Sequence, residues 1–220
     1  MLKNSLADKS FGSDYRLYDF VLVNIMPLID TNTKRIVLAS QSPRRIELLK
    51  KIISDFEIKI SDISEKIDEN DPILFVKKIS NRKATKVAQQ IDNGIIIGAD
   101  SIVVNDDKIL GKPQNEQEAI WMLNFLSGHV HQVFTGLTII EKPGNKIISD
   151  FEVTNVKFRT LAAWEIEKYV RLERPYDKAG SYGIQDGSAV FVERVEGCFY
   201  NVMGLPVTKL FKLLIPFLSP

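Results

Sequence analysis

One stretch constrains the fold more than any other, the run GIIIGADSIVV at residues 94–104. It is apolar and rich in β-branched residues, so we predict a strand in the middle of a sheet with both faces covered. The charge of Asp100 inside this run needs an explanation, because a carboxylate is costly to bury without a partner. Lys112, which follows a predicted hairpin around Asp106 and Asp107, is the candidate partner. A structural ion pair and a catalytic or metal-binding carboxylate both remain open at this point.

Strands and helices alternate along the chain from residue 34 onward. Short apolar or alternating segments predict strands, at 35–39, 56–60, 94–104, 129–141, 146–159 and 189–197. Apolar residues at helical spacing, with capping residues before several of them, predict helices at 44–53, 71–91, 115–128, 160–173 and 205–218. The pattern is that of the α/β class, a mixed sheet flanked by helices.

Composition and the first residues limit where the protein acts and what it binds. Residues 1–33 differ from the rest and are predicted to be a variable N-terminal extension of a domain at 34–220. Their apolar patch, residues 20–29, is too short to cross a bilayer, which takes about 20 residues. The formal net charge of +1 provides no overall field for nucleic acid or an anionic membrane. A single cysteine, Cys198, fits a reducing compartment, so we predict a cytoplasmic protein.

Polar side chains gather after the first predicted strand, in the segment SQSPRR. Ser40, Ser42, Arg44 and Arg45 lie between this strand and the start of a helix, where free backbone N–H groups and the helix dipole favour an anion. Arginines add charge-assisted contacts to phosphate. A capped helix with two solvated arginines is the alternative interpretation.

A second polar segment, YDKAGSYGIQDG at 176–187, contains three glycines that let a backbone approach a ligand closely. Asp177, Lys178 and Gln185 offer polar groups beside them. An ordinary glycine-rich loop would have the same composition, so this segment alone does not decide between the two.

Three stretches, LASQSPRR, GADSIVV…LGKP and DKAGSYGIQDG…VEGCFYNVMGLP, stand in the order and spacing of one family. The chain closely resembles the Maf family of nucleoside triphosphate pyrophosphatases over residues 35–215. The resemblance implies a Maf-type, inosine triphosphatase-like mixed sheet with a cleft between two lobes. It also implies a divalent cation (Mg²⁺, Mn²⁺ or Co²⁺) and hydrolysis of a nucleotide to its monophosphate and pyrophosphate. A homodimer is a further state that it leaves open.

Carried over residue by residue, the resemblance makes Asp100 the general base and a metal ligand, with Glu69 as the second metal ligand. The residues that it places around the phosphates are Ser40, Arg44, Arg45, Lys83 and Lys112. Phosphoryl chemistry consists mostly of positioning and charge neutralisation, so cations around a carboxylate and a metal suit it.

Three specificity positions resemble the dTTP and UTP pyrophosphatase subgroup: Arg44, Ser101 and Gln185. An amide such as that of Gln185 can donate and accept hydrogen bonds along the edge of a pyrimidine. We therefore expect a house-cleaning enzyme for dTTP and UTP, with CTP and modified pyrimidine nucleotides as further substrates. The alternatives are a pyrophosphatase for 7-methyl-GTP or for many nucleotides, and a nucleotide-binding regulator of cell division and septum formation.

Overall fold

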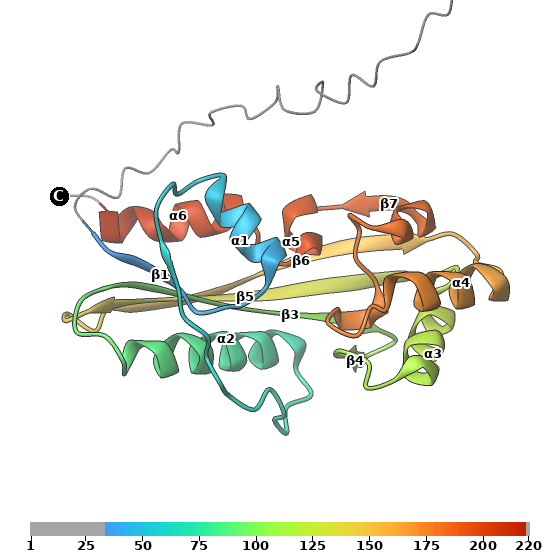
Figure 1. Ribbon diagram of the computed structural model, residues 1–220, viewed down its shortest axis with the longest axis horizontal. Helices are drawn as coiled ribbons and strands as arrows, with labels where there is room; N and C mark the ends of the chain where they lie inside the picture. The colour runs from blue at the N-terminus through green and yellow to red at the C-terminus, as the bar shows by residue number, and fades with distance from the viewer. Residues whose placement is uncertain (1–33, 219–220) are drawn as a thin grey trace, which may run out of the picture.

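The computed structural model describes residues 34–218, so the predicted extension at residues 1–33 lies outside the described residues. Within residues 34–218, no helix is long and apolar enough to cross a membrane. The described part of the chain forms a seven-stranded mixed sheet with helices on both faces, which confirms the predicted fold class (Figure 1).

The sheet has the strand order β2-β1-β3-β5-β6-β7, and β4 pairs with the C-terminal end of β3. The pairings of β1 with β2 and β3 are parallel, and the other pairings are antiparallel. The strands are β1 (Ile36–Leu38), β2 (Glu57–Ile58), β3 (Gly94–Asn105), β4 (Lys108–Leu110), β5 (Val130–Lys142), β6 (Ile147–Phe158) and β7 (Val192–Glu196). The run 94–104 is thus a strand in the middle of the sheet, as predicted.

Six α-helices and two short 3₁₀ helices surround this sheet within residues 34–218. They are α1 (Pro43–Lys50), α2 (Pro72–Ala88), α3 (Glu116–Leu126), α4 (Ala163–Glu173), α5 (Phe199–Met203), α6 (Val207–Leu218), η2 (Ala179–Ser181) and η3 (Gly187–Phe191). Figure 1 shows α2 on one face of the sheet and α1, α5 and α6 on the other, with α3 and α4 together at one end.

Both faces of β3 are buried. Successive side chains of a strand point to opposite sides, so neighbouring residues of β3 pack against different helices. Ile95 and Ile97 belong to a core cluster with residues of α1 and α6, whereas Ile96 packs with residues of α2. The largest fully buried side chains of the described residues include all three of these isoleucines. This two-sided burial is the reason for an unbroken apolar run where an exposed strand would alternate.

Helix α2 lies unusually close to the sheet because two glycines face it. A Cβ on Gly98 would lie 2.4 Å from the carbonyl oxygen of Ser80, and a Cβ on Gly136 would lie 2.2 Å from that of Val76. Any larger residue at either position would push the helix away. This close approach brings Lys83 of α2 to Asp100 of β3, whose Nζ and Oδ1 atoms are 2.7 Å apart.

Helix starts follow the capping residues in the sequence. The Asp71 carboxylate accepts hydrogen bonds from the backbone N–H groups of Ile73 and Leu74, at 2.8 and 3.2 Å. The Asn115 side chain accepts from the N–H of Glu118 at 2.9 Å. Both helices therefore begin where the sequence predicts.

Two predicted strands differ from the structure. The segment 189–197 is a strand only from Val192, because the Asp186 carboxylate accepts a hydrogen bond from Ser188 N–H at 3.0 Å and starts the 3₁₀ helix η3. The segment 56–60 is reduced to Glu57–Ile58, an exposed pair at the edge of the sheet. An edge strand pairs on one side only, so alternation of apolar and polar residues overestimates the length of such a strand.

Candidate active site

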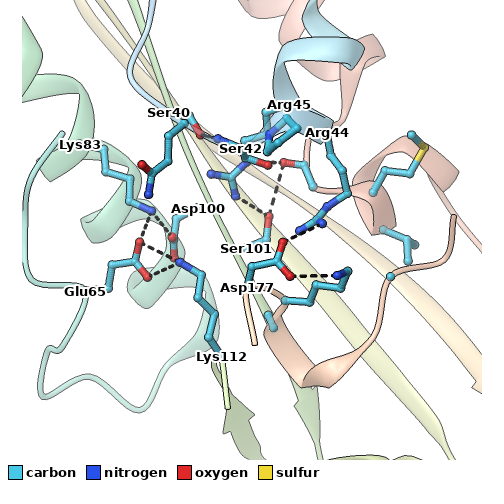
Figure 2. Close-up of a pocket in the computed structure, with 18 of the residues that line it drawn as sticks. Ser40, Ser42, Arg44, Arg45, Glu65, Lys83, Asp100, Ser101, Lys112 and Asp177 are labelled. Atoms are coloured by element: carbon cyan, nitrogen blue, oxygen red, sulfur yellow. Dashed lines mark hydrogen bonds and ion pairs between the residues drawn. The ribbon is translucent and has the colours of Figure 1, made fainter. Parts of the chain in front are cut away.

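A polar pocket with a volume of about 530 Å³ lies between the loop before α1 and the segment 177–185 (Figure 2). Residues of α2 and β3 also line it. Its polar and charged lining residues include Ser40, Ser42, Arg44, Arg45, Glu65, Lys83, Asp100, Ser101, Lys112, Asp177, Lys178 and Gln185. The structure thus brings every predicted site residue except Glu69 to one place.

The loop between β1 and α1 forms one wall of the pocket. The hydroxyl oxygen of Ser40 accepts a hydrogen bond from Ser42 N–H at 3.2 Å. Ser42 is the N-cap residue of α1, but its side chain caps none of the helix N–H groups, and Pro43 follows in the first turn. The uncapped N-terminus of α1 therefore presents backbone N–H groups at the pocket, where they favour an anion.

Arg45 is partly buried and serves as a structural link. Its guanidinium donates to the carbonyl oxygens of Ala99 at 2.8 Å and Gly204 at 2.9 Å, and to the hydroxyl of Ser101 at 3.0 Å. Burial lowers the pKa of Arg45, and the nearby charge of Asp100 opposes that shift. Three of its donors are engaged by the protein itself, so Arg45 ties β3 to the chain after α5.

Asp100 and its neighbours form a row of alternating charges. Lys83 Nζ lies 2.7 Å from Asp100 Oδ1 and 2.7 Å from Glu65 Oε1, and Lys112 Nζ lies 3.1 Å from Glu65 Oε2 (Figure 2). The predicted pairing of Asp100 with Lys112 is therefore wrong. The close packing of α2 on β3 delivers Lys83 to Asp100, and Lys112, more than half exposed, reaches Glu65 instead.

The two carboxyl groups of this row differ in protonation behaviour. Burial raises the pKa of Asp100, against the opposing effects of Lys83 and Arg45. At Glu65 burial also favours the neutral form, but the two neighbouring lysines outweigh it and lower the pKa to about 2. Glu65 is therefore anionic at neutral pH, whereas Asp100 is the carboxylate that is easier to protonate.

Glu69 lies outside this pocket, in a neighbouring hollow that Glu65 also lines. Its carboxylate accepts from Asp71 N–H at 3.1 Å and forms an ion pair with Lys78 of α2. Sequence reasoning did not identify Glu65 as a pocket residue. Both glutamates fall in a segment without helix or strand, residues 59–71, so no periodicity indicated which of them faces Asp100.

The opposite wall comes from the glycine-rich segment 176–187. Asp177 Oδ2 accepts a hydrogen bond from Arg44 Nη1 at 3.1 Å, and its Oδ1 accepts from Lys178 Nζ at 2.9 Å. Gln185 lines the pocket with an exposed side chain. Within residues 34–218 its amide has no hydrogen-bond partner, so it is free to contact a ligand.

Ser101 does not present a free hydroxyl to the pocket. Its oxygen accepts from Arg45 and shares a hydrogen bond with the hydroxyl of Thr135, with the two oxygens 2.8 Å apart. A residue at this position therefore acts on the pocket mainly by holding the Arg45 guanidinium.

The donor set suits a divalent cation only when a ligand completes it. Among residues 34–218 no group of three or more histidine, cysteine, aspartate or glutamate side chains could hold a metal by itself. Mg²⁺ is commonly held by one or two carboxylates together with substrate phosphates. Asp100 and Glu65, which share Lys83 as a partner, fit that arrangement.

Fold and site together define an α/β protein with a pocket for a small polyanion. In this pocket a helix N-terminus and four cationic side chains surround a buried carboxylate, and the four are Arg44, Lys83, Lys112 and Lys178. Comparison with known proteins agrees with this class. The family model described as Maf-like protein matches residues 35–217, and the chain belongs to the Maf family.

Several similar proteins are named dTTP/UTP pyrophosphatase. The chain is 48% identical over 187 residues to a dTTP/UTP pyrophosphatase of Clostridium botulinum (strain Kyoto / Type A2), covering 83% of this chain and 96% of that protein. It is 47% identical over 178 residues to a dTTP/UTP pyrophosphatase of Carboxydothermus hydrogenoformans, covering 81% and 96%. Among solved structures, the Staphylococcus aureus Ham1 protein has a TM-score of 0.45 at 12% identity, covering 84% of this chain and 100% of that chain, too remote to support an argument.

Proposed function

We propose that this protein is a nucleoside triphosphate pyrophosphatase that hydrolyses dTTP and UTP to the nucleoside monophosphate and pyrophosphate. The observation that carries the proposal is the Asp100 carboxylate, buried at 5% exposure and held by Lys83 in a pocket lined with cations. Relatives named dTTP/UTP pyrophosphatase that are 46 to 48% identical support the choice of substrate.

Substrate binding in this proposal uses the open N-terminus of α1 together with Arg44, Lys83 and Lys112. A triphosphate carries several negative charges, and side chains fixed on rigid elements neutralise them without reorganisation. Lys83 is held by α2 and has only 9% of its side chain exposed, whereas Lys112 and Arg44 lie nearer the solvent. Because Lys83 is the least exposed of the three, we assign it to the reacting phosphate, and we assign Lys112 and Arg44 to the outer phosphate oxygens.

Asp100 acts as the general base. A water molecule attacks the α-phosphorus, its proton passes to the Asp100 carboxylate, and the bond from the α-phosphorus to the bridging oxygen breaks, so that pyrophosphate leaves. The raised pKa of Asp100 suits this role, because a carboxylate with an ordinary pKa is a weak base at neutral pH. Lys83, at 2.7 Å, fixes the carboxylate in the orientation needed.

A divalent cation fits beside Asp100, with Glu65 as the second carboxylate in reach of the pocket. When bound it would neutralise phosphate charge and favour ionisation of the attacking water. We infer Glu65 rather than Glu69 for this position, because Glu65 lines the pocket with Asp100 whereas Glu69 lines only the neighbouring hollow and is paired with Lys78. The test measures the Mg²⁺ concentration that gives half the maximal rate in Glu65→Gln and in Glu69→Gln. That concentration should rise in Glu65→Gln and stay close to the wild-type value in Glu69→Gln.

Selectivity for pyrimidines is assigned to Gln185, which lines the pocket, with Arg44 and Ser101 shaping the phosphate side. Ser101 contributes through its hydrogen bond to Arg45. The test is a screen of dTTP, UTP, CTP, ATP and 7-methyl-GTP, with added inorganic pyrophosphatase and colorimetric phosphate detection. Asp100→Asn serves as the inactive control. A wild type that prefers 7-methyl-GTP, or an Asp100→Asn variant with near-normal turnover, would overturn the proposal.

A further inference from the structure

One carboxylate in the pocket has no part in the proposed reaction, that of Asp177 on the segment between α4 and η2. Its two oxygens are held by two cations, Arg44 Nη1 at 3.1 Å and Lys178 Nζ at 2.9 Å. Figure 2 shows it reaching across the pocket to Arg44, on the side of Ser101 away from Lys83 and Glu65. The ion pair joins two residues that are 133 positions apart in the sequence.

Asp177 is ionised at neutral pH. Partial burial favours its neutral form, but the hydrogen bonds and charges of Lys178 and Arg44 outweigh burial and keep the pKa of Asp177 below its ordinary value. A guanidinium binds carboxylates and phosphates through the same pairs of N–H groups. The carboxylate of Asp177 therefore engages a donor of Arg44 that a phosphate group in this pocket would also use.

We propose that Asp177 is a specificity-determining residue that competes with the substrate's phosphates for Arg44. It binds Arg44 in the free protein, gives way when a polyphosphate enters and returns when the product leaves. The inference rests on the proposed function, since it concerns the phosphate-binding wall of the same pocket. The ligand class it selects is an anion with enough charge to displace a carboxylate, a triphosphate rather than a monophosphate.

The exchange is energetically accessible because the ion pair is solvated. The side chain of Asp177 is 58% exposed and that of Arg44 is 27% exposed. Exposed ion pairs change an equilibrium constant by at most about fivefold, whereas hydrogen bonds between charged groups in a pocket contribute more. Asp177 also keeps Lys178 when it releases Arg44, so its charge is not left alone.

Lys178 is well placed to retain Asp177. Only 14% of its side chain is exposed, and its Nζ also lies 3.7 Å from Asp186 Oδ2. Asp186 in turn accepts a hydrogen bond from the hydroxyl of Tyr169 at 3.1 Å. The cation that stays with Asp177 is thus fixed by packing, and only the contact to Arg44 has to break.

The test compares Asp177→Asn with Asp107→Asn, which removes one negative charge from an exposed hairpin turn outside the pocket. Binding of inorganic tripolyphosphate, without divalent metal, is measured by isothermal titration calorimetry on the full chain. We expect Asp177→Asn to lower the Kd by about two- to fivefold and Asp107→Asn to leave it nearly unchanged. Asp177→Glu, which keeps the carboxylate, should restore most of the wild-type Kd.

Kinetics with UTP give a second readout. In Asp177→Asn we expect KM to fall by about the same factor while kcat stays within about twofold, and inhibition by UMP to become stronger. An unchanged Kd, or a decrease no larger than in Asp107→Asn, refutes the competition. A higher Kd also refutes it and shows that Asp177 positions Arg44 for binding. A wild type that binds tripolyphosphate but does not turn over UTP refutes the proposed function alone, because the Kd comparison still decides the role of Asp177.

Discussion

The buried pair of Lys83 and Asp100 predicts an asymmetric response to mutation. Lys83→Met removes the cation that lies 2.7 Å from a carboxylate of 5% exposure, and leaves that charge in the protein interior. Breaking a buried ion pair on one side costs about 3 to 5 kcal/mol of folding free energy. The charge of Arg45 also favours ionised Asp100, so we place the expected loss near 3 kcal/mol, at the lower end of that range.

Asp100→Asn should be far milder. Lys83 keeps Glu65 at 2.7 Å, so its charge remains paired, and the burial that disfavours ionised Asp100 no longer acts on a neutral amide. We expect a loss of about 1 kcal/mol or less, together with complete loss of turnover. The double variant should be more stable than Lys83→Met alone, because no unpaired carboxylate remains.

The measurement is equilibrium unfolding in urea near neutral pH in metal-free buffer, for the wild type, both single variants and the double variant. A loss for Asp100→Asn equal to that for Lys83→Met would refute the reasoning. So would simple additivity in the double variant, since residues in direct contact should couple by more than about 0.5 kcal/mol.

Three further predictions test the core, the packing of α2 and the specificity of the pocket. Burial lowers the pKa of His131 to about 3, so between pH 6.5 and pH 5 the unfolded chain takes up a proton that the native state does not. The free energy of unfolding should therefore fall by about 2 kcal/mol from pH 8 to pH 5, and His131→Gln should remove that decrease. Gly136→Ala places a Cβ 2.2 Å from the Val76 carbonyl oxygen and should cost at least about 2 kcal/mol in urea unfolding, whereas Gly111→Ala, with no atom within 4 Å, should change stability by less than about 0.5 kcal/mol. Gln185→Ala should lower kcat/KM for dTTP and UTP by about tenfold or more and leave ATP nearly unchanged, and a uniform decrease across nucleotides would show that Gln185 only supports its loop.

Local patterns in the sequence were sufficient for most elements of the fold. The central position of 94–104 follows from its unbroken apolar run, because only burial on both faces removes the alternation of a strand. Helix starts at Asp71 and Asn115 follow from short-range hydrogen bonds that each residue makes with the next few N–H groups. Such signals lie within one turn of chain, so they can be read without a structure.

Elements governed by distant contacts were less predictable. The segment 189–197 alternates like a strand, yet its first residues form a 3₁₀ helix that Asp186 caps and the buried ring of Phe191 anchors. The ring of Phe191 packs against those of Phe158 and Tyr169, which come from β6 and α4. Side chains from other elements decided this conformation, and the period of the segment contains no information about them.

The site divides in the same way. By itself the sequence indicated that Asp100 is a carboxylate on a buried strand and that cations and a helix N-terminus accompany it, since these depend on residue type and on the order of strand, loop and helix. The tertiary structure decided which lysine meets Asp100 and which glutamate enters the pocket. Lys83 pairs with Asp100 because two glycines let α2 approach the sheet. Glu65 lines the pocket in ion pairs with Lys83 and Lys112, and the sequence could not predict this because irregular chain has no period that indicates the direction of a side chain.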